Sequence, residues 1–396
     1  MRAQLPVYAA GMFSNGAVQL AAVIVPLWML IIDPSPLMVG IALGARQVLP
    51  VLLSIHGGAL MDRMGIRRVM IWFSVLGVVT PILFPVFPFF AAVLILQMLG
   101  GISAAMGWIG TQAQIGAIMK GSPTYAGRVT FFNRFGTLAG PPATGLAWDL
   151  GGAWGGFGFL TFWGVALLAA CLAMPKAKTG DAGGGTTAAA DTSWRDVLPR
   201  VGDYISAFRL MAIPAIAFVV AVTLLRHSSN GMLTSFYVVW LEIQGYSGTL
   251  IGGLISVSSI LGGIGSLMAG RLANAFTAYR VLIFSVCCAI LCLTVTPLLG
   301  SAVLLAIASM LRGGFMGVSQ PLLISIMAQS AGNSQGKAVG LRTTVNRLAI
   351  LVVPVIMGAV AEFFGIAVSF YAVGALLIGL MLLVGWRSRN AFPKAS

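Results

Sequence analysis

Four ionisable side chains lie deep inside long apolar runs of this sequence, and they are its best candidates for chemistry. They are Arg46, Arg226, His227 and Arg312, and no Asp or Glu stands beside them. An arginine keeps its proton, so each guanidinium must meet water, a backbone carbonyl or an anion. Two hypotheses follow, and the sequence favours neither: the arginines hold an anionic solute, for example a carboxylate, or they line a hydrated path.

Proton transfer needs a group that titrates in the same region, and His227 is the one such side chain near the middle of an apolar run. Imidazole titrates near neutral pH, so proton relay is one hypothesis for His227 and a packed, inert histidine is the other. Asp33 and Glu242 stand at the ends of apolar runs, where a solvated loop carboxylate is the simpler interpretation.

Amide and aromatic side chains on the same runs could contact a solute. The tripeptide Ser-Asn-Gly occurs twice, centred on Asn15 and Asn230. An asparagine near the middle of a membrane helix bonds either to a solute or to a neighbouring helix, and both remain open. Trp108 and Phe236 are the aromatic candidates for the same binding surface.

The composition predicts a membrane protein. Of 396 residues, 59% are hydrophobic and 8% charged, with a mean hydropathy of +0.98, whereas about a quarter of the residues of soluble domains are charged. The net charge of +14 is spread between apolar runs, which argues against a nucleic-acid-binding face. The four cysteines lie in apolar runs without the spacing of a zinc site, so we predict no metal site.

Apolar windows long enough to cross about 30 Å of hydrocarbon predict an all-α integral membrane fold of twelve helices. They cover residues 7–32, 36–57, 69–87, 89–119, 127–149, 154–174, 211–240, 246–270, 279–299, 301–329, 337–362 and 365–385. The polar stretch in the middle predicts three parts: an N-terminal six-helix bundle at 1–174, a cytoplasmic linker at 175–210, and a C-terminal six-helix bundle with a short cytoplasmic tail at 211–396.

The distribution of Lys and Arg predicts the orientation. With the N-terminus inside, 18 of the 23 lie in cytoplasmic segments or at their helix ends, the other five lie within helices, and none lies outside. This is the bias expected of cytoplasmic loops. We therefore expect both termini in the cytoplasm and a multi-pass protein of the cell membrane, the inner membrane if the cell is bacterial.

The two halves repeat. A shift of 213 positions pairs Asn133 and Arg134 with Asn346 and Arg347, and a shift of 212 relates the second window to the eighth. Helix n therefore corresponds to helix n plus six, so the halves are expected to be pseudo-symmetric. The two Asn-Arg pairs lie towards the cytoplasmic ends, where we expect a gating or snorkelling role, with solute contact as the alternative.

Two motifs carry a family resemblance. The turn between the second and third windows reads GALMDRMGIRR, which resembles the loop signature of the major facilitator superfamily. The resemblance implies a conformational latch in which Asp62 faces the N-terminal turn of the eleventh helix; the alternative is a turn whose charges only fix topology. The residues that match the signature are Gly58, Asp62, Arg63, Gly65, Arg67 and Arg68.

The fifth window resembles the glycine motif of the drug:proton antiporter branch of that family. Gly127, Gly136, Gly140, Pro141 and Gly145 match it, and Thr144 replaces one glycine. Small residues every four positions allow a neighbouring helix to approach closely, and the proline should bend the helix. Generic close packing is the alternative. One departure weakens the inference of proton coupling, because Gln97 stands where many proton-coupled relatives carry an arginine.

The resemblance implies a secondary transporter that moves a small organic solute by alternating access. We expect proton-coupled efflux, with uptake or exchange of an organic anion bound by the intramembrane arginines as the alternative. The expected partners are the solute, whose anionic character stays open, and the lipid bilayer, with no nucleic acid. The carrier is expected to act as a monomer, driven by the proton gradient without a cofactor. An enzyme would need a nucleophile with its base or a metal cluster, and the sequence offers neither.

Overall fold

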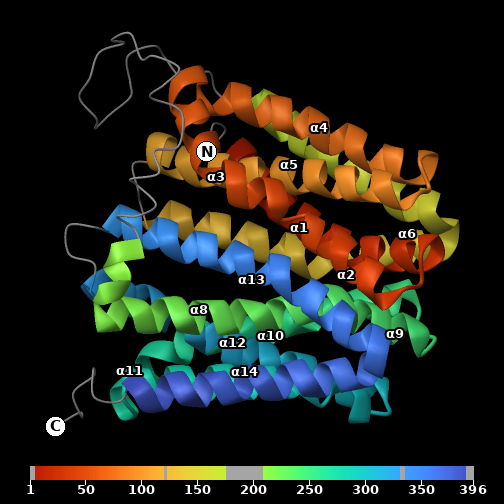
Figure 1. Ribbon diagram of the computed structural model, residues 1–396. Coiled ribbons are helices and arrows are strands. Elements are labelled where there is room, and N and C mark those ends of the chain that lie inside the picture. The colour runs from red at the N-terminus through yellow and green to blue at the C-terminus, as the bar shows by residue number, and fades with distance from the viewer. Residues whose placement is uncertain (1–4, 120–122, 175–207, 331–334, 389–396) are drawn as a thin grey trace. The chain divides into compact units, whose positions relative to one another are not determined.

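The computed structural model describes residues 5–119, 123–174, 208–330 and 335–388, without the side chains of 54–56, 58–59, 62–63, 112–119, 123–131, 328–329 and 335–340. The described residues form helices and no strands, which confirms the all-α prediction (Figure 1). The α-helices are α1 (Leu5–Ile32), α2 (Pro36–Ala45), α3 (Val48–Met64), α4 (Ile66–Val86), α5 (Phe90–Met119), α6 (Pro123–Ala173), α8 (Pro214–Met232), α9 (Val238–Ile243), α10 (Gly248–Ala275), α11 (Ala278–Thr294), α12 (Ala302–Ser330), α13 (Gln335–Phe364) and α14 (Ile366–Ser388).

Ten segments of the described chain are long and apolar enough to cross a membrane, and α11 is a shorter apolar helix. One of the ten, Phe132–Ala173, has 42 residues and contains two spans, because α6 is interrupted at Gly152. A Cβ on Gly155 would meet the carbonyl of Ala147, so the two parts of α6 fold back on each other. With α6 counted as two spans and α11 included, the helices are consistent with the twelve predicted windows.

Gly152 and Gly365 allow the chain to reverse direction at equivalent positions of the two predicted halves. Both have positive backbone φ angles, 56° and 85°. Residues with a Cβ atom rarely adopt such φ angles, so glycine is the residue that lets the chain reverse there. The two glycines are related by the same shift of 213 positions that pairs the Asn-Arg dipeptides.

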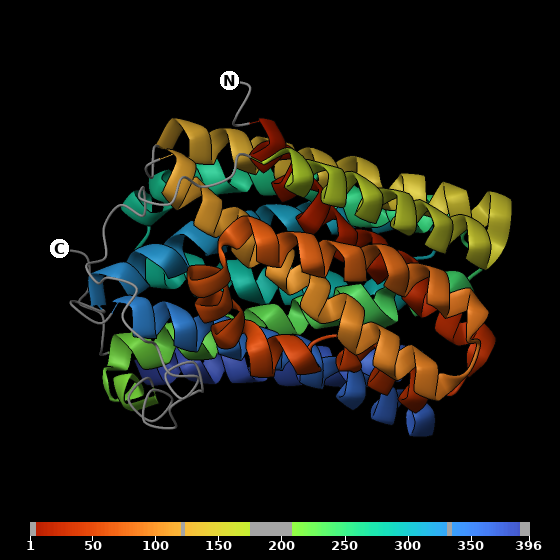
Figure 2. The same cartoon turned by 90° about the horizontal axis from the view of Figure 1, so that it is seen from above.

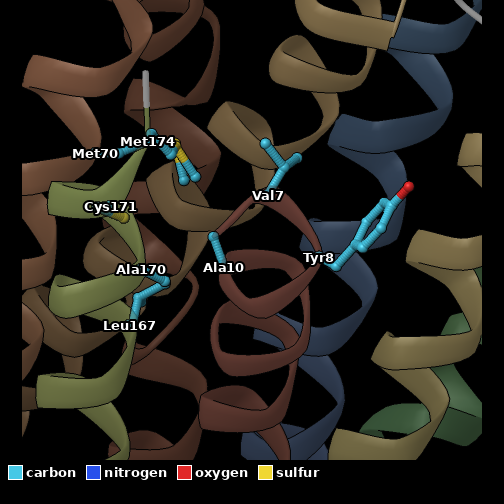
Figure 3. Close-up of a cluster of buried hydrophobic side chains, with 8 residues drawn as sticks. All are labelled: Val7, Tyr8, Ala10, Met70, Leu167, Ala170, Cys171 and Met174. Atoms are coloured by element: carbon cyan, nitrogen blue, oxygen red, sulfur yellow. The ribbon is translucent and has the colours of Figure 1, made fainter. Parts of the chain in front are cut away.

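The chain forms two compact units: residues 1–28 with 45–200, and residues 29–44 with 201–396. In the first unit α4 contacts both α5 and α6, and α4 and α5 are neighbours in both views (Figures 1 and 2). Side chains of α1 and α4 and of the end of α6 pack into a buried cluster there (Figure 3). It consists of Val7, Tyr8, Ala10, Met70, Leu167, Ala170, Cys171 and Met174.

In the second unit α10 and α12 form the most extensive helix pair, and α8 packs against α13 and α14. The segment 29–44 belongs to this unit. The carboxylate of Glu362, in the last turn of α13, accepts hydrogen bonds from the Ser35 hydroxyl (2.9 Å) and the Leu37 N–H (3.3 Å). Glu362 therefore satisfies a free N–H in the first turn of α2, where a negative charge is favourable.

Two apolar windows that read as single helices are interrupted in the structure. The window at 36–57 divides into α2 and α3, with a turn at Arg46 and Gln47. The window at 211–240 continues from α8 through a π-helical turn at Leu233–Tyr237 into α9. Such interruptions occur frequently at functional sites, and each lies next to one of the predicted arginines or its partner.

Two very close helix contacts, one in each unit, are related by a shift of 212 positions. A Cβ on Gly101 of α5 would overlap the carbonyl of Arg46, and a Cβ on Gly313 of α12 would overlap the carbonyl of Ser258 in α10. Each crossing therefore requires glycine. The repeat seen in the sequence is thus also a repeat of helix contacts.

The glycine crossing makes a stability prediction. Gly313→Ala should destabilise the protein by about 1–3 kcal/mol, because the added methyl group displaces the backbone of α10. Gly253→Ala is the matched control on α10, because nothing lies within 4 Å of its added Cβ. The control should stabilise the helix by up to about 1 kcal/mol. Midpoints of thermal unfolding of the detergent-solubilised variants test this, and equal midpoints would contradict it.

Candidate functional site

Arg226 of α8 is the centre of a polar cluster in the second unit. Its Nε donates to the Ser319 hydroxyl (2.8 Å) and its Nη2 donates to the Met316 carbonyl (3.1 Å), both on α12. Its Nη1 lies 3.3 Å from Nε2 of His227. A guanidinium has no acceptor, so the imidazole Nε2 accepts this bond and the proton of the neutral ring lies on Nδ1. That Nδ1 is buried and has no hydrogen-bond partner among the described residues.

Arg312 of α12 is the second cation of this cluster and is only 4% exposed. Its Nη2 donates to Oδ1 of Asn230 (3.2 Å), and its buried Nε has no partner among the described residues. Asn230 lies in the last turn of α8, immediately before the π-helical turn. The end of α8 therefore brings Arg226 and Asn230 to the same face of α12.

The π-helical turn also places Tyr237, whose hydroxyl lies 3.1 Å from that of Ser309 on α12. Both side chains line a narrow space next to Arg312 within the second unit. This space has no room for a water molecule, so it is not a solute pocket.

Arg46 is a half-buried cation of the first unit. It lies in the turn between α2 and α3, and its Nη1 donates to Oε1 of Gln97 on α5 (3.3 Å). Gln97 is 1% exposed. The consecutive glycines Gly100 and Gly101 give the arginine room, since a Cβ on Gly100 would lie 3.7 Å from Nη1 and one on Gly101 would lie 3.2 Å from Cγ.

No carboxylate of the described residues forms an ion pair with any of the three guanidinium groups. Among the described residues, the hydrogen-bond acceptors of Arg46, Arg226 and Arg312 are neutral oxygens or nitrogens. Arg312 and Arg342 even act on Arg226 as like charges. The carboxylates whose side chains are described all lie at or beyond helix ends; they are Asp33, Asp149, Glu242 and Glu362. As far as the described residues go, the positive charge of these arginines is therefore not balanced by a neighbouring carboxylate in either unit.

The remaining predicted solute contacts differ in their surroundings. Asn15 and Trp108 are half-buried in the first unit, and Phe236 is fully buried in the second. The indole of Trp163 donates to the Phe13 carbonyl (2.9 Å) beside Asn15, and Gly16 gives its ring room. The role of these residues in binding stays a prediction.

The predicted latch lies partly outside the described residues, namely the side chains of Asp62 and Arg63 and the surroundings of Gly58. Gly65 makes the turn between α3 and α4 with φ of 86°. Arg67 donates to the Leu172 carbonyl at the end of α6 (2.8 Å), and Arg68 is exposed. The described part thus holds α4 against α6, and the latch itself stays a prediction.

The glycine motif of α6 packs against α1 within the first unit. A Cβ on Gly136 would lie 2.8 Å from the Met12 carbonyl, and one on Gly140 would lie 2.5 Å from Cδ1 of Leu20. The Thr144 hydroxyl donates to the Gly140 carbonyl (2.9 Å), so the residue that replaces a glycine has its polar group satisfied on its own helix. Pro141 lies in this helix and Gly145 is buried. The surroundings of Gly127 lie outside the described residues.

The repeated Asn-Arg pairs are partly buried. Asn133 is 8% exposed, and its Oδ1, like that of Asn346, has no hydrogen-bond partner among the described residues. Arg134 is exposed and Arg347 is half-buried, and both lie well inside their helices, α6 and α13. Their gating role stays a prediction.

Two polar partners were missed by the sequence analysis. Ser319 follows Arg312 by seven residues, two helical turns, so both lie on one face of α12, and this periodicity could have indicated it. In the sequence, Gln97 was notable only because many proton-coupled relatives carry an arginine at this position. Its bond to Arg46 depends on a contact between helices far apart in the chain, which spacing cannot reveal.

The long apolar helices and the charged residues inside both units define a polytopic membrane transport protein. The sequence matches the family model for the Major Facilitator Superfamily over residues 7–348 and 219–395. The chain belongs to the Major Facilitator Superfamily. It is therefore a transporter, as predicted, and not an enzyme. No curated protein matches the sequence.

Solved structures share the fold at low sequence identity. A point mutant of the nucleoside transporter NupG has a TM-score of 0.78 at 13% identity, over 98% of this chain and 100% of that one. A bacterial homologue of the human lysosomal transporter Spinster, inward-facing and unoccupied, has a TM-score of 0.69 at 14% identity, over 98% and 96%. Such identities establish the fold alone.

Ser319→Ala tests the Arg226 cluster. Loss of the acceptor for Nε should weaken the apparent affinity for a transported solute by about two- to tenfold, because a charged donor loses one hydrogen bond. Ser266→Ala is the control, because that hydroxyl donates only to Gly263 of its own helix. The apparent KM in proteoliposomes is the measurement, and equal KM values for both variants would exclude a role of Ser319.

Proposed function

We propose that this transporter moves a small organic anion that binds to one or more of Arg46, Arg226 and Arg312. The observation that carries the proposal is that, within the described part of the chain, Arg46, Arg226 and Arg312 donate to neutral atoms and to no carboxylate. An unbalanced charge away from water is costly unless a counter-ion arrives. A carboxylate, sulfonate or phosphate group of the solute supplies that counter-charge while it is bound.

The geometry around Arg312 supports the same proposal. One of its donors is used by Asn230, whereas the buried Nε has no partner among the described residues. A guanidinium has five N–H donors in a planar fork that matches two oxygens of an anion. Arg312 therefore keeps donors for a solute while its orientation is fixed by Asn230.

Nucleosides, the solutes named for NupG, are the neutral alternative. A neutral solute gains much less than an anion from a guanidinium, so the two alternatives predict different responses to loss of charge. The comparison is made with membrane-impermeant anions, because a weak acid crosses lipid in its protonated form without a carrier.

Arg46→Gln, Arg226→Gln and Arg312→Gln should each lower transport of the anion by about ten- to a hundredfold, because each removes a hydrogen bond to a charged group. Arg387→Gln is the control, since Arg387 is exposed in the last turn of α14. Counterflow of labelled succinate, isethionate, phenyl phosphate and uridine in proteoliposomes is the measurement. Transport of uridine alone by the wild type would refute the proposal.

Export in exchange for protons is the second candidate. It is supported by the antiporter-like motif of α6, where Gly136 and Gly140 bring α6 against α1 and Pro141 removes a backbone donor. His227 is the candidate proton carrier, because its protonation would break its bond to Arg226 and add repulsion. We further propose a monomeric carrier of a bacterial inner membrane that uses the proton gradient.

The direction of proton coupling is tested with a pH gradient across proteoliposomes. Antiport predicts that an acidic lumen accelerates uptake of labelled isethionate, since protons leave as the solute enters. His227→Asn should remove this acceleration and leave counterflow without a gradient intact. Acceleration by an alkaline lumen would instead demonstrate symport and contradict the second candidate.

A further inference from the structure

In each unit a carboxamide accepts a hydrogen bond from an arginine side chain and thereby orients it. Arg46 donates to Gln97 in the first unit, and Arg312 donates to Asn230 in the second. We propose that Gln97 and Asn230 determine the sign of charge that the transporter accepts, because they orient the guanidinium groups without neutralising them. The inference rests on the proposed anion transport and adds two specificity-determining residues that act through the arginines.

The argument depends on the difference between an amide and a carboxylate. A carboxamide oxygen accepts a hydrogen bond from a guanidinium and carries no net charge, whereas a carboxylate of the same size would form an ion pair. Gln97 is 1% exposed and Arg312 is 4% exposed, and their partners Arg46 and Asn230 are half-buried, so water screens each pair only in part. A carboxylate at either position would therefore cancel the positive charge that attracts an anion.

The two pairs are not copies of each other produced by the internal duplication. The shift of 212 positions relates Arg46 to Ser258 and Gln97 to Ser309, and it relates Arg312 to Gly100. In the first unit the arginine precedes α3 and the amide lies on α5. In the second unit the arginine lies on α12 and the amide on α8. Duplication alone therefore does not account for an arginine paired with an amide in both units.

Replacing the amides with acids distinguishes a role in helix packing from a role in charge selectivity. Gln97→Glu and Asn230→Asp keep the size of the side chain and strengthen its bond to the arginine. If the amides only held the helices together, both variants would transport as the wild type does. If the amides preserve the charge, anion binding is lost although the fold is as stable as before.

The experiment compares the full-length wild type with Gln97→Glu, Asn230→Asp and the control Gln244→Glu, whose side chain is exposed after α9. Succinate, isethionate and phenyl phosphate are the anionic probes, and uridine is the neutral probe. We expect the apparent affinity for the anions to fall about ten- to a hundredfold in both buried variants and to stay unchanged in the control. The thermal unfolding midpoints should be no lower than that of the wild type.

The outcomes separate this inference from the function on which it rests. If the wild type binds none of the three anions, the proposed function fails and the inference fails with it. If the wild type binds an anion and both acid variants bind it equally well, anion transport stands and the role of the amides is refuted. Unfolding of both acid variants at lower temperature would also refute it, because the new carboxylates would then not be pairing with the arginines.

Discussion

The cost of a charge in lipid is the constraint on which the interior of this transporter depends. An arginine inside the hydrocarbon region needs hydrogen-bond partners from the protein, and those of Arg46, Arg226 and Arg312 among the described residues are neutral atoms. Neutral partners satisfy the N–H groups without cancelling the charge. The positive potential is therefore retained for a counter-ion that arrives from outside the protein.

Glycine gives the space in which these arginines are held. Gly101 and Gly313 let helices cross with the backbone of one against the α-carbon of the other. In the first unit the crossing carbonyl belongs to Arg46 itself, and in the second the arginine directly precedes the crossing glycine. Close packing and the placement of charge therefore depend on the same few residues in each unit.

The α-helices are interrupted next to both arginine–amide pairs. The turn at Arg46 and the π-helical turn after Asn230 both leave the regular α-helical hydrogen-bond pattern within apolar segments. In a membrane such irregular backbone is tolerated where protein or a polar cavity satisfies it. That both interruptions lie beside an arginine pair connects the local backbone to the proposed binding of an anion.

The sequence by itself determined the class of this protein, because apolar windows and the spread of Lys and Arg reflect the bilayer directly. It also determined the repeat and the family, and it identified Arg46, Arg226 and Arg312 as the unusual residues. Only the tertiary structure decided which atoms those arginines bond, that Gln97 is the partner of Arg46, and that two windows are interrupted. These partners and interruptions depend on contacts between helices distant in the chain, and the hydropathy of a segment does not indicate which side chains of other segments it contacts.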